Sequence, residues 1–320
     1  MNMELKEVQY ILAIAECGSL SKAAQHLYVA QSSLSQFLKN YEAQSGYTLF
    51  IRTPQGLKPT CEGALYIHTA RQIMRMQNNL NNQLMELSGL QRGKVCFSLS
   101  SFRSPYLLPL VLPAFRRKYP NIEVAITEAH MARQERLLAE GRADVAFLSL
   151  PLENQEIPYL KVIEEEIFLA APDGHPITAQ ARRNPATGRM WIDYPTMNGQ
   201  DFLLYSINHR LSTFSDQIFT EHHIAPKIIQ THDSFETLIR LAEVGMGLTF
   251  IPETYIDNRH SLSYFSIGET GQFRTLVLGY PPVGYLSKAT RAFSNMVIDM
   301  LQEQHRALDA KLKEGSHIGH

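Results

Sequence analysis

Two short helical patterns joined by a turn occupy the segment from Ser19 to Arg52, near the start of this 320-residue chain. A first helix precedes them, because apolar residues recur at helical spacing from Leu5 to Ala15 before Gly18 ends the pattern. Ala23-Ala24 is small enough to let another helix cross closely, as at the corner of a helix-turn-helix. A third helix is expected from about Gln31 to Ser45. This order of elements predicts a small helical domain.

The third helix carries a polar face that is almost uncharged. Its inner stripe is Leu34, Leu38 and Tyr41, so the remaining side chains point outward. Glutamine can bond bidentately to adenine, serine can bond at any base edge, and lysine can neutralise a phosphate. A solvated helix face would show the same polarity. The candidate DNA-contacting residues on this helix are Gln31, Ser32, Ser33, Ser35, Gln36, Lys39 and Asn40.

A short hairpin after the third helix favours the DNA-binding interpretation. Gly46 ends the helix, and the strand-like runs TLFIR and LKPT follow on either side of residues 53–56. Proline at the second turn position and glycine at the fourth fit a type I turn. The pattern therefore predicts a wing, with Arg52 and Lys58 placed to contact the phosphate backbone.

Residues 3 to about 62 resemble the DNA-binding domain of the LysR-type transcriptional regulators. Three positions depart from the family pattern: Ala30 replaces a frequent capping Ser or Thr, Gln36 replaces a common Arg, and Phe37 replaces a polar residue. These departures concern the DNA sequence that the helix reads rather than its fold. The resemblance is carried by the ordered set Ala23-Ala24, Leu27, Gln31-Ser32, Leu34-Ser35, Glu42, Gly46, Leu49-Phe50, Arg52, Thr60 and Gly63.

A long uninterrupted helix is expected next, over residues 63–92. It contains no Pro, and no Gly between Gly63 and Gly89, so it can span ~40 Å at about 1.5 Å per residue. An apolar stripe often marks a core helix, but the amides between residues 77 and 83 leave the other faces too polar for burial. A dimerising linker helix is the better interpretation, and the resemblance implies the same. The seam residues expected to pair are Ile73, Met76, Leu80 and Leu87.

Charge also favours an oligomer. The whole chain has a formal net charge of −1, and residues 1–62 contain five Lys or Arg against five Glu. One head should therefore attract DNA only modestly, whereas two or four heads on one DNA raise avidity by ~10² to 10⁴. We expect a homodimer or homotetramer on double-stranded promoter DNA.

Strand-like and helical stretches alternate from residue 93 onward, which predicts a mostly parallel sheet in two α/β lobes. The strand-like runs include residues 95–100, 122–126, 144–148, 166–171, 202–206, 227–230, 248–252 and 275–280. The expected fold class is thus α/β with a helix-rich winged helix-turn-helix head. The expected domains are the head at 1–62 (helix-turn-helix about 20–39), the linker at 63–92, an effector domain at 93–305 (lobe I about 93–168 and 271–305, lobe II about 169–270) and a tail at 306–320.

Hydroxyl side chains gather where strands of these lobes end and helices begin. Ligands in open α/β sheets bind at such strand ends, and helix starts favour anions. Helix capping would explain some of these hydroxyls equally well. The candidate effector-binding residues are Ser100, Ser101, Arg103, Phe147, Ser149, Ser206, Asn208 and Thr231, and the expected effector is a small molecule, with an anion or carboxylate as one possibility.

This second region resembles the effector-binding half of the LysR family, which is similar to periplasmic solute-binding proteins. The resemblance implies two lobes that close on a small metabolite, whose identity the sequence does not give. The Arg-bearing stretch from Ala181 to Asn198 has no counterpart in that pattern. The resemblance is carried by Leu108-Pro109, Phe115, Tyr119-Pro120, Gly141, Asp144, His175-Pro176 and the run from Ala242 to Pro252.

Other classes of function receive little support from the sequence. Walker, G-x-S-x-G and HExxH motifs are absent, so neither an enzyme nor a resident cofactor or metal is expected. Cys17, Cys61 and Cys96 are far apart, which fits a reducing cytoplasm without a disulfide framework. The sequence shows neither a signal peptide nor an apolar span of ~20 residues, so no membrane association is expected. The alternative is a cytoplasmic solute-binding module whose head contacts protein rather than DNA.

Overall fold

The computed structural model describes residues 4–87, 93–206, 210–256 and 261–313. The head packs three helices and a two-stranded hairpin around a small core that includes Ile11, Ile14 and Leu34. As the sequence predicted, a hairpin follows the third helix; it is antiparallel and packs against the first and fourth helices. The elements of the head are α1 (Leu5–Cys17), α2 (Leu20–His26), α3 (Gln31–Ser45), β1 (Phe50–Thr53) and β2 (Gly56–Pro59).

Glu42 and Gly63 hold the wing against the helices. The Glu42 carboxylate accepts the backbone N–H groups of Leu49 and Phe50 at 2.6 and 3.1 Å, which fixes the start of β1. A Cβ at Gly63 would lie 2.0 Å from the carbonyl oxygen of Leu49, so only glycine allows this approach. The packing of the wing therefore explains why Glu42 and Gly63 belong to the family pattern.

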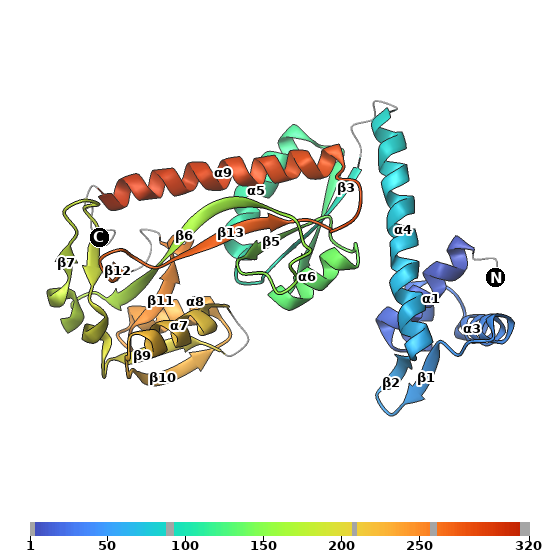
Figure 1. Cartoon of the computed structure of the whole chain (residues 1–320), viewed down its shortest axis with the longest axis horizontal. Coiled ribbons are helices and arrows are strands. Elements are labelled where there is room, and N and C mark those ends of the chain that lie inside the picture. The colour runs from blue at the N-terminus through green and yellow to red at the C-terminus, as the bar shows by residue number, and fades with distance from the viewer. Residues whose placement is uncertain (1–3, 88–92, 207–209, 257–260, 314–320) are drawn as a thin grey trace.

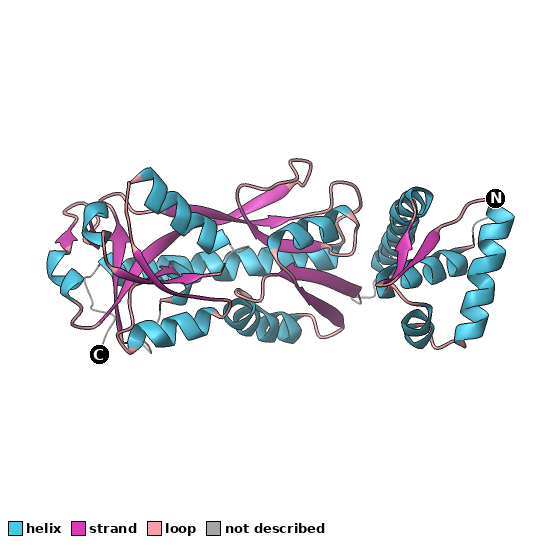
Figure 2. Cartoon of the chain, turned by 90° about the horizontal axis from the view of Figure 1, so that it is seen from below, coloured by secondary structure: helices cyan, strands magenta, loops and turns pink. Residues whose placement is uncertain are grey.

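Helix α4 (Cys61–Leu87) begins inside the head and runs out of it toward the second domain. Ile67 and Ala70 are buried near its start, whereas Met76, Leu80 and Leu84 are exposed further along. Figure 1 shows α4 standing between the head and the two-lobed domain, and Figure 2 shows the head at one end of the molecule. The linker helix is thus rigidly anchored in the head.

Lobe I is built on three parallel strands. Strand β3 pairs with β4 and β5, and Phe97, Phe115 and Phe293 fill the core beside it. Its first elements are β3 (Gly93–Leu99), α5 (Ser104–Lys118), β4 (Ile122–Glu128), α6 (Met131–Ala139) and β5 (Val145–Ser149).

Lobe II contains the larger of the two main cores, centred on Phe168, Phe202 and Phe250. Strands β9 and β10 are parallel, and β12 is parallel to β8. Its elements are η1 (Pro176–Gln180), β7 (Arg182–Arg183), β8 (Met190–Ile192), η2 (Tyr194–Met197), β9 (Asp201–Tyr205), α7 (Arg210–Glu221), β10 (Lys227–His232), α8 (Phe235–Glu243), β11 (Thr249–Pro252), η3 (Glu253–Tyr255) and β12 (Leu262–Ile267).

Two long strands and one long helix connect the lobes. Strand β6 (Tyr159–Pro172) pairs antiparallel with β13 (Phe273–Gly279) in its first half and with β11 and β12 in its second. Helix α9 (Lys288–Lys313) lies along both lobes (Figure 1). The expectation of a mostly parallel sheet is therefore wrong, because β6 and β13, the two long strands that connect the lobes, run antiparallel to their neighbours.

The predicted tail from residue 306 is also wrong as far as Lys313, because α9 continues to that residue. Leu308 packs against the core of lobe II, and the Asp309 carboxylate accepts Arg189 at 2.5 Å. Arg189 also pairs with the buried Glu166 on β6. The stretch 181–198, which has no place in the family pattern, thus ties α9 to the centre of the domain through one arginine.

Among the helices of the described residues, none is long and apolar enough to cross a membrane. No three His, Cys, Asp or Glu side chains gather as metal ligands in the same parts of the chain.

Candidate DNA-binding surface and effector cleft

Helix α3 buries its apolar stripe and exposes most of the residues predicted to contact DNA. Leu34, Leu38 and Tyr41 are buried in the head core. Of the candidate residues on this helix, only Ser35 is half-buried, and the rest are exposed. The exposed candidates are Gln31, Ser32, Ser33, Gln36, Lys39 and Asn40.

Gln36 and Asn40 are hydrogen-bonded to each other. The Gln36 Nε2 donates to Asn40 Oδ1 at 2.8 Å, one helical turn away. This bond leaves the Gln36 Oε1 as an acceptor and the Asn40 amide N–H groups as donors on the outer face. An acceptor and a donor side by side match the N6 donor and N7 acceptor of adenine. The pair can therefore read an A·T base pair as a unit.

The structure explains two of the departures from the family pattern. Phe37 packs edge-on against Tyr10, with ring centroids 5.1 Å apart, and against Tyr41 at 5.8 Å. It therefore joins α3 to α1 instead of facing DNA. Ala30 provides no side-chain cap for α3, so the first amides of the helix remain available to a phosphate.

Arg52 and Lys58 are both exposed on the wing, but they do not share a face. Lys58 lies opposite Ile51, and Arg52 lies opposite Leu57. Residues directly opposite each other point to the same side of a hairpin, so the two cations point to opposite sides. They can contact different phosphates flanking the wing.

Tyr28 is a surface residue that sequence reasoning missed. It lies in the turn between α2 and α3 with a φ of 55°, and its side chain is 97% exposed. The only signal in the sequence was an aromatic residue in a turn, which is a weak one. Its position places an exposed phenol in the turn that precedes α3.

The linker helix exposes two of the four predicted seam residues. Met76 is 67% exposed and Leu80 55% exposed, whereas Ile73 is half-buried. Leu84, which is 55% exposed and one turn beyond Leu80, extends the seam and was not predicted. The side chain of Leu87 lies outside the described residues. A monomer leaves this apolar strip in water, which is unfavourable.

Aromatic side chains join the two lobes beneath the predicted effector site. Phe102, just after Ser100 and Ser101, lies 4.7 Å from Phe235 and 4.8 Å from Tyr255 between ring centroids. It also contacts Tyr205 at 6.0 Å, next to Ser206. The structure therefore brings the end of β3 in lobe I close to the end of β9 in lobe II.

The candidate effector residues fall into two groups. Ser101 and Thr231 are exposed, and Ser100, Ser149 and Ser206 are half-buried, so burial keeps none of the five from contact with a ligand. Asn208 lies outside the described residues. Arg103 and Phe147 are the two corrections, and burial is the reason in both.

Arg103 is 5% exposed and is held by a buried carboxylate. Its two terminal nitrogens donate to Glu165 at 2.9 and 2.6 Å, and Glu165 also accepts Arg274 at 2.7 Å. Burial alone would raise the pKa of Glu165, but Arg103 and Arg274 together hold it well below its usual range. Arg103 is therefore part of a buried ion-pair network with Glu165 and Arg274, and the prediction that it binds the effector is wrong.

Phe147 is 3% exposed and belongs to the core of lobe I. Its ring faces the guanidinium of Arg103 at 5.5 Å. Phe147 shares a face of β5 with Ser149, two residues further on, but the core of lobe I covers it. The prediction that Phe147 lines the site is also wrong.

Arg210 is a cationic residue between the lobes that sequence reasoning missed. From the start of α7 in lobe II it donates to the carbonyl oxygen of Pro151 in lobe I, and its Nε lies 3.1 Å from the sulphur of Met131. Ser149 contacts the same sulphur at 3.9 Å. In the sequence, Arg210 is a basic residue at the start of a helix that follows a strand. Many arginines with a structural role have the same position, so this signal is weak.

A winged helix-turn-helix joined by a long helix to a two-lobed α/β domain defines a class of DNA-binding regulators with an effector-binding domain. Residues 5–64 match the family described as bacterial regulatory helix-turn-helix protein, lysR family, and residues 88–302 match the LysR substrate binding domain. This chain belongs to the LysR family of transcriptional regulators.

Similar proteins match nearly the whole length of the chain. The chain is 27% identical over 311 residues to an uncharacterised HTH-type transcriptional regulator, YcgK, of Bacillus subtilis, covering 94% of this chain and 96% of that one. It is 26% identical to the hydrogen peroxide-inducible genes activator of Haemophilus influenzae, covering 93% and 97%.

Solved structures share the fold. A variant of full-length OxyR from Pseudomonas aeruginosa has a TM-score of 0.71 at 22% identity, covering 94% of this chain and 95% of that one. Full-length CbnR in complex with its target DNA has a TM-score of 0.61 at 20% identity, covering 93% and 100%.

Proposed function

We propose that this regulator reads promoter DNA with paired heads and that a small anion, with a carboxylate as the main candidate, binds between the lobes beside Arg210. The observation that carries the effector assignment is the bridge from Arg210 to the Pro151 carbonyl. This bond joins lobe II to lobe I close to Ser149, at the hydroxyl-bearing end of β5. An anion that captures the guanidinium replaces a neutral carbonyl partner with a charged one, which is the stronger bond.

Such a ligand acts on the arrangement of the lobes. It must bind two arrangements with different affinities, because a ligand with equal affinity for both shifts nothing. Arg210 meets this condition, since its partner across the cleft changes when the ligand binds. We propose that the resulting lobe movement alters the spacing of the heads through α4.

A noncovalent effector fits this chain better than a redox signal. The relative from Haemophilus influenzae is a hydrogen peroxide-inducible genes activator. Here the sequence has no cysteine after Cys96, and burial raises the pKa of the Cys96 thiol to about 11. A thiol with a raised pKa is a poor nucleophile at neutral pH.

A ligand screen tests the effector assignment. The full chain is melted with small carboxylates, amino acids and aromatic acids, and a true ligand at 100 times its dissociation constant should stabilise it by ~2.7 kcal/mol. Arg210→Ala and Ser101→Ala should each shrink the shift by lowering affinity, whereas Thr213→Ala, exposed on the same helix as Arg210, should leave it intact. Full-sized shifts in both cleft variants with every ligand that the screen finds would refute the site.

DNA readout gives a second prediction. Gln36→Ala should weaken binding to the cognate site by about 1 to 3 kcal/mol and relax its preference for one base pair. Lys39→Ala should weaken all sequences alike and reduce the salt slope of log K by about 1. Competition gel shifts with cognate and scrambled DNA at several salt concentrations measure both. Uniform losses in both variants would contradict the assignment of Gln36 to base readout.

A further inference from the structure

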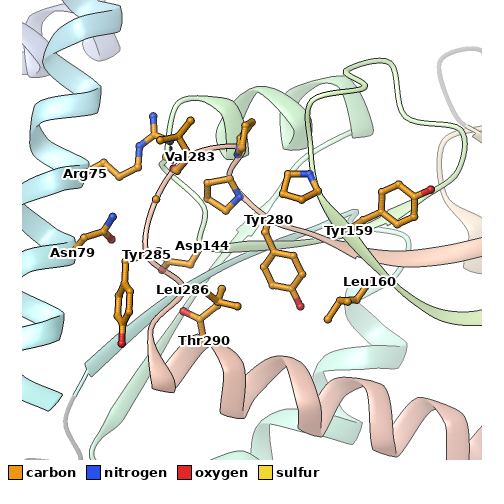
Figure 3. A pocket seen from close by; sticks show the side chains of 15 residues that line it. Arg75, Asn79, Asp144, Tyr159, Leu160, Tyr280, Val283, Tyr285, Leu286 and Thr290 are labelled. Carbon is orange, nitrogen blue, oxygen red and sulfur yellow. Dashed lines mark hydrogen bonds between the residues drawn. The ribbon is translucent and has the colours of Figure 1, made fainter.

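A cavity of about 390 Å³ lies between the linker helix and lobe I, on the side of the lobe that faces the head. Figure 3 shows Arg75 and Asn79 entering it from α4, opposite the loop from Tyr280 to Leu286. Asp144, directly before β5, also lines it. This junction cavity is distinct from the effector site proposed between the lobes beside Arg210, because neither Ser101 nor Arg210 lines it.

The linker helix is fastened around this cavity by arginines. Arg71 pairs with Glu140 at 2.7 Å, and Arg75 donates to the carbonyl oxygens of Val283 and Ala139 at 3.1 and 3.2 Å. Gly141 leaves the space that Arg75 occupies, since a Cβ there would lie 2.2 Å from its Nε. The bonds of Arg71 and Arg75, together with the space at Gly141, therefore hold α4 against lobe I.

Arg75 is a cation without an anionic partner among the described residues. Both of its hydrogen bonds go to neutral carbonyl oxygens, and three of its five N–H donors remain. Burial lowers the pKa of Arg75, because no carboxylate compensates its charge. A ligand carboxylate would supply that compensation with a charge-assisted bond.

The other walls suit a flat ring with a hydrogen-bond donor. Tyr159, Tyr280 and Tyr285 line the cavity together with three prolines, and such surfaces stack well on aromatic rings. The Asp144 carboxylate accepts the Cys96 amide at 2.7 Å and has lone pairs left for a further donor. Burial raises the pKa of Asp144, which a donated hydrogen bond would offset.

We propose that the junction cavity is a second small-molecule site, which takes an aromatic carboxylate with a ring hydroxyl or amino group. The carboxylate pairs with Arg75, the ring lies between the tyrosines and prolines, and the ring donor bonds to Asp144. Because this ligand contacts both α4 and lobe I, its binding favours the docked arrangement of the linker helix. It therefore couples to head spacing independently of the cleft.

Calorimetric titration of the full chain with 4-hydroxybenzoate tests the proposal. Leu160, which is 49% exposed at the cavity, is replaced by Trp to fill the space, and Ile228, 53% exposed on lobe II, is replaced by Trp as the matched control. Leu160→Trp and Arg75→Gln should each raise the dissociation constant about tenfold or more, with Arg75→Lys between Arg75→Gln and the unmodified chain. Ile228→Trp and the cleft variant Arg210→Ala should leave it unchanged.

Hydrogen exchange on the unmodified chain gives an independent readout. Saturating 4-hydroxybenzoate should slow exchange in residues 72–79 and 283–286 and leave residues 201–206 unaffected. The proposal is overturned if 4-hydroxybenzoate does not bind, or if the Leu160→Trp variant binds it as tightly as the unmodified chain. Loss of binding in Arg210→Ala alone would also overturn it, since the ligand would then occupy the cleft.

Discussion

Replacing Glu165 by Gln is expected to lower the free energy of unfolding of the effector domain by about 3 to 5 kcal/mol, because it leaves buried charges without a partner. Glu165 is fully buried on β6 and accepts bonds from Arg103, Arg274 and Thr254. These partners come from the start of α5, from β13 and from η3. One carboxylate on β6 therefore binds β13, the start of α5 in lobe I and η3 in lobe II.

The neighbouring Glu164 provides the control. Its side chain is 57% exposed and pairs with Lys161 on the surface. Glu164→Gln removes the same charge one position along the strand and should change stability by less than about 1 kcal/mol. Urea denaturation of both variants, followed by circular dichroism, measures the difference. If both variants lost the same small amount of stability, the bonds of Glu165 would not be what holds the lobes together.

Acid should act on the same network. The folded-state pKa of Glu165 is held below the ordinary glutamate value of 4.5 by its two arginines. Its contribution to stability is therefore fully present above about pH 4.5 and is lost as the pH falls toward the folded-state pKa. The stability of the Glu165→Gln variant should decline less steeply below that pH. Denaturation curves between neutral and acid pH compare the two slopes.

The head could be predicted closely from the sequence because its signals are local. Gly18 and Gly46 end helices in the left-handed conformation, and each lies directly after the helix that the spacing of apolar residues predicted. The turn residues at 53–56 likewise predicted the hairpin. The spacing of the apolar residues in α3 also identifies its inner face, and the residues on its outer face could therefore be predicted as exposed.

The effector domain was less predictable because its key contacts are distant in sequence. Arg103 and Glu165 are 62 positions apart, and no local pattern shows that one cancels the charge of the other. A serine-rich strand end with an arginine therefore suggested a ligand site, although the arginine is buried. The first half of β6 was missed for a related reason: its exposed Tyr159 and Lys161 interrupt the apolar run.

Replacing Met76 and Leu80 together by Glu is expected to reduce affinity for promoter DNA by on the order of 10²-fold or more, because the heads then bind singly. Both side chains lie on the exposed strip of α4, where we propose that a second copy packs. Four glutamates in one dimer seam would repel each other and could not be buried. Sedimentation velocity should show monomers at concentrations where the unmodified chain is a dimer or tetramer.

The control for this double variant lies one residue from Leu80. Asn81 is exposed and points ~100° further round the helix, off the strip, so Asn81→Glu adds negative charge to α4 without entering the seam. It should keep the oligomer and most of the DNA affinity. If Asn81→Glu weakened DNA binding as much as the double variant, repulsion between α4 and DNA would explain both results. Loss confined to the double variant, with monomers in sedimentation, is the result that pairing through α4 requires.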